Sequence, residues 1–510
     1  MARVAIVNCN LRKGKLRANP TVLNKLRHRL LRLSSTEEDD EFDALVNIMF
    51  ECSGDALRQL IGRFPDELRQ AYMLMDGRTL ANVAYKQRDP VATEFIANDE
   101  TLVKRVSQRV DSADQDAITR VEERLRHNCK EERMLKTLCA LIVALVATAD
   151  EMKDYGIPNW SCDAELMKRS KTFPKSVHSL RPADIDVIAA LGDSLTAANG
   201  AGAVVNDAVA VLIQYRGLAF GIGGDKSLDE HVTLTNVLRK FNPNLFGYST
   251  GTGSANVWKT AKLNAAIPGA QTDDLVGQAY DLIRRMKDHP EVDYDNSWKL
   301  VHIFIGGNDI CNWCDHPDVE SETKFRDNIG AAVQILKDNM PKTIVVLVGM
   351  LDLSLLRSID KGKYFCDALH TFECPCEREM NFSDEAIREQ CKKYMATEQE
   401  LQDGRFDTTE DFTLVIQPFF EDLNVPPLLP DGEPDLSFFA PDCFHFSAYG
   451  HAVVAKTLWN NIMQPVGAKD KTANLTDLSQ PLACPDKDCP FIRTTKNSDN
   501  CAQYMTPAAN

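Results

Sequence analysis

Four short apolar runs, rich in β-branched residues, recur along the chain at residues 186–191, 300–305, 343–348 and 412–416. Runs of this length and composition are typical of strands that are buried on both faces of a parallel sheet. Amphipathic segments at 273–287 and 324–337 lie between them and predict helices. This alternation predicts an α/β fold, a three-layer α/β/α sandwich with a mainly parallel central sheet.

The chain ahead of residue 134 follows other patterns. Its first acidic residue is Glu37, so residues 1–36 form a basic stretch, which is typical of a targeting or interaction arm and also of a solvated basic helix. The pattern from 41 to 110 is helical. We therefore expect a helical or irregular N-terminal extension over residues 1–133.

The segment 134–149 has the layout of a secretory signal peptide. It has a positive flank at Arg133, about a dozen apolar residues and the small-residue ending Ala147-Thr-Ala149. Such a peptide does not belong in the interior of a chain. A true start at Met134, an uncleaved signal anchor and a buried core helix are the three explanations, and the first two place an exported domain over residues 150–510.

Glycosylation motifs and cysteines divide at the same point. The sequons at Asn159, Asn381 and Asn474 all follow Ala149. Eleven of the 15 cysteines also follow it, some in close pairs whose spacing fits no standard zinc framework. Disulfides in a domain that is secreted, or membrane-associated through the secretory pathway, are the better interpretation, and the odd number leaves at least one thiol free or paired between chains.

Composition limits the class of partner. The 510 residues are 44% hydrophobic, enough for a large core. A formal net charge of -16 argues against a nucleic-acid binder, which would normally present a basic face.

Polar residues follow the first two predicted strands. Run 186–191 stops at Gly192, and Ser194 comes two residues later. Run 300–305 is followed by two glycines and then Asn308, whose side-chain amide can donate a hydrogen bond. Open α/β sheets place their sites at the carboxyl ends of strands, so Ser194 is a candidate nucleophile. A Ser/Asp turn and an Asx turn that only close the strands are the plainer interpretations.

Two further loops carry candidate chemistry. Gly269 lies in a Pro-Gly corner ahead of the helix predicted at 273–287, where a backbone amide could point at an anion, although an ordinary helix-start loop looks the same. Asp442 and His445 are three residues apart in a loop, so the carboxylate can fix the tautomer of the imidazole. His451 is a rival base, but it lies within the following amphipathic helix and has no carboxylate at that spacing.

Together these loops supply every role that acyl transfer needs. A nucleophile, a general base, a carboxylate that orients the base and donors for the oxyanion are all required. One decoy competes, because residues 247–251 fit the G-x-S-x-G pattern around Ser249. No strand pattern precedes that serine and no helix pattern follows it, so we expect a substrate-lining loop there instead.

These segments resemble the four sequence blocks of the GDSL (SGNH) hydrolases. Gly192-Asp-Ser-Leu195 is similar to the first block, Gly269 to the glycine of the second, Gly307-Asn-Asp309 to the third and Asp442-x-x-His445 to the last. Within that family the chain most resembles the phospholipase B group, through the sequences at 264–270 and 306–311, Cys314 and the cysteine-containing tail. The resemblance covers roughly residues 184–498 and says nothing about the first 133 residues.

The resemblance implies the SGNH hydrolase fold and a role for each matched residue. Ser194 would attack an ester carbonyl, His445 would take its proton and Asp442 would hold His445. The backbone amides of Ser194 and Gly269 and the side chain of Asn308 would stabilise the oxyanion, with no metal and no organic cofactor.

The implied substrates are phospholipid and lysophospholipid acyl esters. The apolar residues at 423–430 and 438–439 suggest an acyl groove or a rim that contacts a membrane surface, or else a proline-rich loop packed on the core. A secreted esterase for short acyl or acetyl groups is the alternative within enzymes. A non-catalytic lipid-binding or adhesion protein is the alternative outside them.

Overall fold

A computed structural model describes residues 153–204, 208–360, 366, 370, 373–378 and 383–505 of the protein. These residues all lie in the unit Glu151–Asn510. The predictions for segments 1–133 and 134–149, and the sequon at Asn381, fall outside the described residues.

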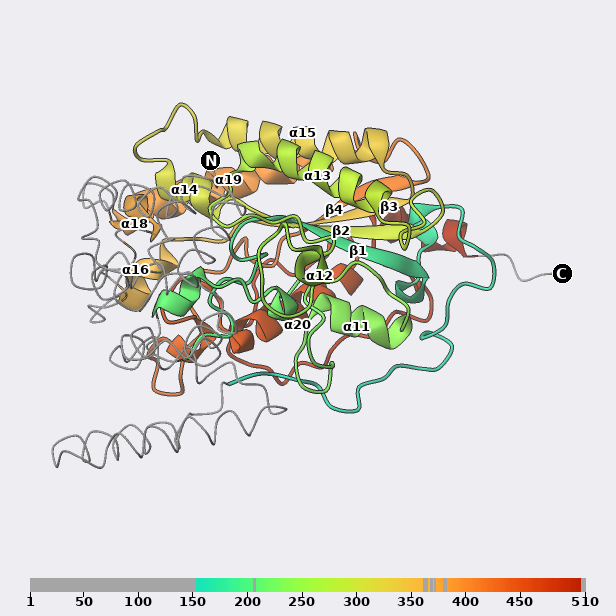
Figure 1. Ribbon diagram of the computed structural model, residues 1–510, viewed down its shortest axis with the longest axis horizontal. Coiled ribbons are helices and arrows are strands. Elements are labelled where there is room, and N and C mark those ends of the chain that lie inside the picture. Colours follow the sequence, from blue (N-terminus) through green and yellow to red (C-terminus); the bar gives the residue numbers. More distant parts are fainter. Residues whose placement is uncertain are drawn as a thin grey trace, which may run out of the picture. The chain divides into compact units, whose positions relative to one another are not determined.

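Four parallel strands form the central sheet of the described chain, in the order β1-β2-β3-β4 (Figure 1). Their bounds are β1 Ile185–Gly192, β2 Trp298–Phe304, β3 Thr343–Val348 and β4 Phe412–Gln417. All four predicted strands are present, with ends that differ by no more than two residues. Every side chain of β2, β3 and β4 is buried, as their mainly apolar sequences predict, and this includes the polar side chains of Lys299 and His302 in β2.

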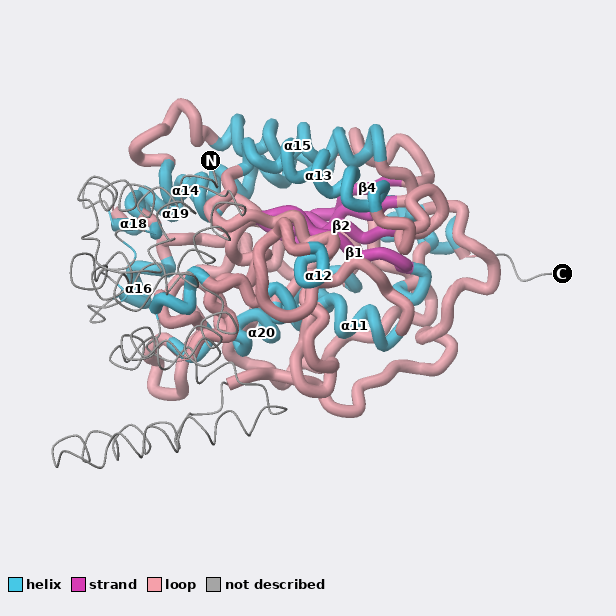
Figure 2. Tube along the Cα trace, in the orientation of Figure 1, coloured by secondary structure: helices cyan, strands magenta, loops and turns pink. Residues whose placement is uncertain are grey.

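Successive residues of each strand pack into two different cores. Val345 belongs to the core under α13 (Leu275–Asp288), α15 (Glu322–Asn339) and α19 (Asp384–Gln399), whereas Val346 belongs to the core over α11 (Leu234–Phe241) and α20 (Ala448–Met463). Figure 2 shows the two groups of helices on opposite faces of the magenta strands. The three-layer α/β/α sandwich is therefore confirmed.

Helix α20 is more deeply buried than the amphipathic pattern predicts. All of its side chains except Thr457 and Asn460 are buried. Its outer face is covered by the C-terminal tail, because Trp459 donates to the carbonyl of Ala483 at 2.7 Å and Asn460 donates to that of Pro481 at 3.0 Å. The predicted helix is thus present, and the tail buries the side of it that lies away from the sheet.

Shorter elements complete the described chain. The remaining helices are α12 Trp258–Ala261, α14 Gly307–Asn312, α16 Leu355–Asp360, α18 Pro375–Arg378 and α21 Thr495–Asp499. The 3-10 turns are Val177–Ser179, Pro182–Asp184, Ala208–Leu212, Arg216–Leu218, Thr272–Asp274, Glu400–Gln402, Leu436–Phe438 and Cys501–Tyr504. Helices α14 and α16 follow the carboxyl ends of β2 and β3, and they lie at one end of the sheet together with α18 (Figure 1).

Disulfides confirm the interpretation of the cysteines. The pairs are Cys162–Cys484, Cys311–Cys374, Cys314–Cys376, Cys366–Cys443 and Cys489–Cys501. Among the described cysteines the odd thiol is Cys391, which is buried and whose pKa is raised by burial to about 12. Within the same part of the chain, no helix has both the length and the apolar content to cross a bilayer.

Candidate active site

The turn that presents Ser194 depends on Gly192, the last residue of β1. This residue has φ +155°, and a Cβ there would lie 2.4 Å from the carbonyl oxygen of Phe304. The side chain of Gln278 in α13 donates to the Gly192 carbonyl and accepts from its N–H, both at 2.9 Å. The end of the strand is thus held on both sides, and only glycine fits.

The residues after Gly192 close a tight turn. The carboxylate of Asp193 accepts from the N–H of Leu195 at 2.9 Å, and the carbonyl of Ser194 accepts from the N–H of Asn199 at 3.0 Å. Burial raises the pKa of Asp193 to about 6. Ser194 itself is 8% exposed, so it lies just below the surface at the carboxyl end of β1.

Ser194, His445 and Asp442 form one hydrogen-bonded series. The Nε2 atom of His445 lies 2.8 Å from Oγ of Ser194, and Nδ1 lies 2.5 Å from Oδ2 of Asp442. The other carboxylate oxygen of Asp442 accepts from the backbone N–H groups of Phe444 and His445, both at 3.1 Å. The loop ahead of α20 therefore holds the carboxylate in one orientation, and the carboxylate holds the imidazole.

The electrostatics of the pair favour charge on both partners. Burial disfavours the imidazolium, but the charge and hydrogen bond of Asp442 outweigh burial and raise the pKa of His445. Burial likewise acts to raise the pKa of Asp442, but His445 and two backbone donors outweigh it and lower that pKa. Asp442 thus stays ionised beside His445.

Two of the three predicted oxyanion donors, Gly269 and Asn308, lie on adjoining segments, a loop and the first turn of α14. The side-chain amide of Asn308 donates to the carbonyl of Ala270, next to Gly269, at 2.9 Å. An asparagine amide has two N–H groups, so the second can serve an oxyanion. Gly269 has φ +80° and is exposed, and a Cβ there would meet nothing within 4 Å. The start of α14 also approaches the Ser194 turn, because a Cβ on Gly307 would lie 3.9 Å from Oδ2 of Asp193.

Several contacts that position the site were not predicted from the sequence, although Asp309 belongs to the third sequence block. Asp309 accepts from the N–H of Thr272 at 3.1 Å and from its hydroxyl at 2.6 Å, which joins the Asn308 helix to the Gly269 loop. Arg216 is buried and donates to the carbonyl of Ala266 at 2.7 Å, three residues before Gly269. A polar residue in an apolar setting is the only signal for such side chains, and it does not identify a partner.

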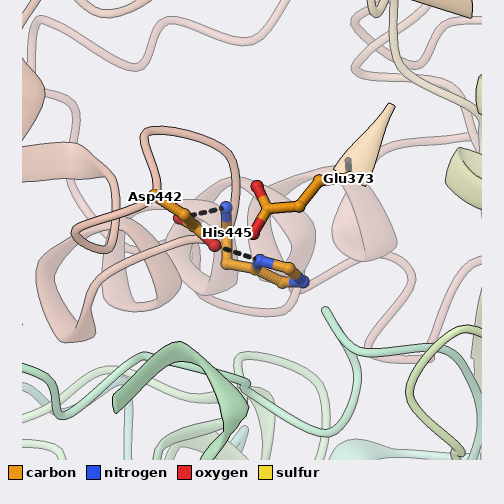
Figure 3. A group of neighbouring side chains, drawn as sticks. All are labelled: Glu373, Asp442 and His445. Carbon is orange, nitrogen blue, oxygen red and sulfur yellow. Dashed lines mark hydrogen bonds and ion pairs between the residues drawn. The ribbon is translucent and has the colours of Figure 1, made fainter. Parts of the chain in front are cut away.

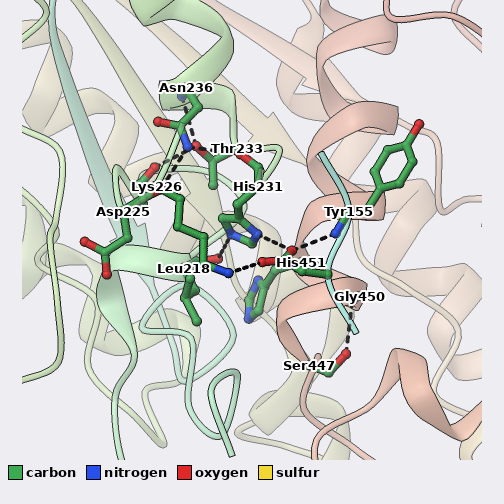
Figure 4. Close-up of polar contacts among 12 residues, drawn as sticks. Tyr155, Leu218, Asp225, Lys226, His231, Thr233, Asn236, Ser447, Gly450 and His451 are labelled. Atoms are coloured by element: carbon green, nitrogen blue, oxygen red, sulfur yellow. Dashed lines mark hydrogen bonds and ion pairs between the residues drawn. The ribbon is translucent and has the colours of Figure 1, made fainter. Parts of the chain in front are cut away.

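Neither rival of the predicted site belongs to it. Ser249 is fully buried and donates to the carbonyl of Ala261 at 2.9 Å, so the expected substrate-lining role is not supported. His451 is also fully buried, and its Nδ1 accepts from the N–H of Phe220 at 3.3 Å. Figure 4 shows His451 on the α20 side of a packed region that also holds His231 and Tyr155. Burial lowers the pKa of His451 well below its usual value, so it stays neutral.

One group of side chains has the composition of a metal site. Glu373, Asp442 and His445 each place a ligand atom within 4.8 Å of the other two (Figure 3). Asp442 and His445 are already bonded to each other and, through His445, to Ser194. A cation on Nδ1 would displace the Asp442 bond, so the chemistry of this group fits proton transfer better. That no metal is needed stays a prediction.

The hydroxyl of Ser194, the imidazole of His445 and the carboxylate of Asp442 are bonded in series at the carboxyl edge of a parallel sheet, an arrangement of the kind that serine hydrolases use. The sequence model of the family "GDSL-like Lipase/Acylhydrolase" matches residues 188–458, which is more than half of the chain. The chain belongs to this family of ester hydrolases, as its motifs predict.

Three curated relatives carry the name "Phospholipase B1, membrane-associated". The human protein is 44% identical over 337 residues, which cover 64% of this chain and 23% of the relative. The Rattus norvegicus protein is 41% identical over 65% of this chain and 23% of its own length, and the Mus musculus protein is 42% identical over 65% and 22%. The chain therefore spans about a quarter of the length of these relatives.

Among solved structures, a GDSL-like lipase of Parabacteroides merdae aligns with 54% of this chain and 94% of its own, at 13% identity and a TM-score of 0.29. A TM-score this low does not support an inference about the fold of this chain.

Proposed function

We propose that the chain is a serine esterase that hydrolyses the acyl esters of phospholipids and lysophospholipids, like a phospholipase B, through an acyl-enzyme on Ser194. The hydrogen-bonded series from Ser194 through His445 to Asp442 carries the proposal. Family membership supports an ester as the target, and the relatives' name supports a phospholipid.

In the first half of the reaction, Oγ of Ser194 attacks the ester carbonyl while Nε2 of His445 takes its proton. Asp442 keeps Nδ1 protonated and faces the imidazolium that forms. The oxyanion accepts from the backbone N–H groups of Ser194 and Gly269 and from the side chain of Asn308. Removing one such donor costs about 10²–10³ in kcat in related sites.

In the second half, the proton on His445 passes to the leaving alcohol and the acyl group stays on Ser194. Water then attacks the acyl-enzyme, and His445 again takes the proton and returns it to Oγ. No step uses a metal or an organic cofactor.

Exposed apolar side chains support contact with lipid. Ile267, two residues before Gly269, is 41% exposed, and Leu429 is also 41% exposed. Phe438, in contrast, is buried and packs against Phe446 and Tyr449. The proposed acyl contact therefore rests on Leu429 and its half-buried neighbour Leu428.

The same proposal places the domain in the secretory pathway, in solution outside the cell or at a membrane surface. The five disulfides of the described residues fit an oxidising compartment. Two of the three sequons, at Asn159 and Asn474, are exposed and therefore accessible to glycosylation. Intact mass and N-terminal sequencing of the native protein test the division into 1–133, 134–149 and 150–510, and a mature start near Asp150 is expected.

The test of function compares substrates on the purified full-length protein and on Ser194→Ala. We expect the wild type to release long-chain fatty acid from phosphatidylcholine and lysophosphatidylcholine, and Ser194→Ala to release none. Hydrolysis of a short nitrophenyl ester without release of long-chain fatty acid would instead favour the secreted short-chain esterase. If Ser194→Ala hydrolysed esters as fast as the wild type, the nucleophile would be misassigned, and if neither did, a lipid-binding protein would remain.

The lipid contact has its own test. Replacing Leu428 and Leu429 by serine is expected to impair hydrolysis of phosphatidylcholine vesicles more than hydrolysis of the short ester. Equal loss on both substrates would exclude a lipid-specific role for this loop.

A further inference from the structure

A second carboxylate lies beside the base of the proposed site. The carboxylate of Glu373 has an oxygen within 4.8 Å of both the Asp442 carboxylate and a ring nitrogen of His445. In Figure 3 the Glu373 and Asp442 carboxylates approach the imidazole from different sides. The Oε2 atom of Glu373 is buried and has no hydrogen-bond partner among the described residues. An ionisable group is seldom buried in this way without a reason.

Covalent bonds hold Glu373 in this place. Three disulfides converge on its segment, namely Cys311–Cys374, Cys314–Cys376 and Cys366–Cys443. The first joins it to α14, which carries Asn308, the second joins it to the residues just after that helix, and the third joins it to the loop of Asp442 and His445. In addition, Nε2 of His370 lies 2.9 Å from the carbonyl oxygen of Asp442. The position of Glu373 therefore does not depend on a hydrogen bond donated to this carboxylate oxygen.

The charged groups around Glu373 and His445 come from three parts of the fold. Asp442 and His445 lie in the loop ahead of α20, His370 is in the segment of Glu373, and Asp193 is in the Ser194 turn. Burial raises the pKa of Glu373 to about 7, the charge of Asp442 adds to this effect, and His445 and His370 oppose it. Glu373 and Asp193 both act, after Asp442, to raise the pKa of His445. His451 in α20 stays neutral.

We infer that Glu373 is a positioning residue for acyl transfer, whose carboxylate adds a second negative charge beside His445 and stabilises the imidazolium formed when Ser194 gives up its proton. The inference rests on the proposed function. Glu373 neither gives nor takes a proton in the step, because the proton moves from Oγ of Ser194 to Nε2 of His445 and onward to the leaving group. Asp442 sets the tautomer, and Glu373 acts by charge alone.

The sign of the effect follows from Coulomb's law. A negative charge favours the imidazolium, so its removal lowers the pKa of His445 and weakens it as a base. For a charge about 5 Å away in a partly screened site, the shift is about one pH unit. The carboxylate of Glu373 is charged above its pKa of about 7. Glu373→Gln should therefore lower the plateau rate above that pH by about three- to tenfold and move the acid limb of the pH–rate profile down by up to about one unit.

The experiment uses the full-length protein with two readouts, both followed from about pH 5 to about pH 9. One is kcat and KM for a short nitrophenyl ester. The other is the rate at which a fluorophosphonate modifies Ser194, which reports activation of the nucleophile whatever the natural substrate is. Glu398→Gln is the matched control, because Glu398 is also buried, with a pKa raised by burial to about 8, and it accepts from the N–H of Met350 at 2.9 Å.

Glu373→Gln is expected to shift both profiles with KM unchanged, whereas Glu398→Gln shifts neither. Glu373→Asp keeps the negative charge, so the acid limb of its pH–rate profile should coincide with that of the wild type. This second variant tests the inference even if Glu373→Gln does not fold. Profiles of Glu373→Gln that superimpose on the wild type, or a Glu373→Asp variant with the shifted limb, would overturn the inference. Modification of Ser194 without hydrolysis of phospholipid would contradict the proposed substrate alone.

Discussion

Replacing Asp442 by asparagine tests the proposed proton path with the smallest change of shape. The two side chains have nearly the same size, but one oxygen becomes an NH₂ group. In the protein, Oδ1 of Asp442 accepts two backbone N–H groups at 3.1 Å, while Oδ2 faces Nδ1 of His445 at 2.5 Å. The two backbone donors require an acceptor, so the asparagine must place its oxygen there and its NH₂ group toward His445.

This orientation reverses the tautomer of the imidazole. Nδ1 must then accept a hydrogen bond, and the ring proton moves to Nε2, the atom 2.8 Å from Oγ of Ser194. A protonated Nε2 cannot take the proton of Ser194. In comparable triads the wrong tautomer costs about 10⁴ in kcat, which is about 5.4 kcal/mol of transition-state stabilisation.

The assay is kcat for a short nitrophenyl ester, with thermal unfolding to show that the variant is folded. Asp435→Asn is the control, because Asp435 lies seven residues earlier and accepts from Ser437 and from Lys153 without contacting the three residues of the site. We expect a loss of about ten-thousandfold for Asp442→Asn and little change for the control. A folded Asp442→Asn variant within about tenfold of the wild type would refute the tautomer argument.

Three further changes probe other parts of the site. The pKa of His445 is raised, so the imidazole loses its proton at a higher pH than a free imidazole does. The rate of ester hydrolysis should therefore rise with pH through an acid limb centred above about pH 6.5. An acid limb at or below that pH would contradict the ion pair of His445 with Asp442. Gly192→Ala places a Cβ within 2.4 Å of two oxygen atoms and should lower the free energy of chemical unfolding by about 3 kcal/mol or more. Gly269→Ala meets no neighbour and should lower it by only about 1–2 kcal/mol, because of its positive φ. Equal losses of stability in the two variants would be inconsistent with these surroundings. Asp309→Ala leaves the N–H and the hydroxyl of Thr272 without their acceptor. It should lower the free energy of unfolding by about 2–4 kcal/mol and should also lower kcat. An unchanged kcat would show that these hydrogen bonds do not position the loop of Gly269.

Local sequence was sufficient for the layers of the fold. Strands β2, β3 and β4 are buried along their whole length, so apolar runs such as 343–348 identify them without knowledge of their neighbours. The amphipathic pattern identified α13 and α15 in the same way. It also identified α20, but it could not show that the outer side of this helix is covered by a tail more than twenty residues further along the chain.

For the candidate site, the residues could be named from the sequence, but their contacts could not. Ser194, Gly269, Asn308, Asp442 and His445 could be named from the sequence because each has a short motif, and because parallel strands bring their carboxyl ends to one edge of the sheet. Their motifs carry no distances. Only the folded chain shows that His445 bridges Ser194 and Asp442, and that Ser249, in a better-known motif, is buried and bonded elsewhere.

The sequence by itself determined the fold class, the family, the candidate residues of the site and the presence of disulfides, since these depend on residue type and local spacing. The tertiary structure alone decided which cysteines pair, how Gln278 holds the end of β1, and that Glu373 lies beside His445. Apart from the Cys489–Cys501 pair, which is 12 residues apart, each of these is a contact between residues more than 60 positions apart in the sequence. Such contacts follow from the packing of the whole chain, so no local pattern records them.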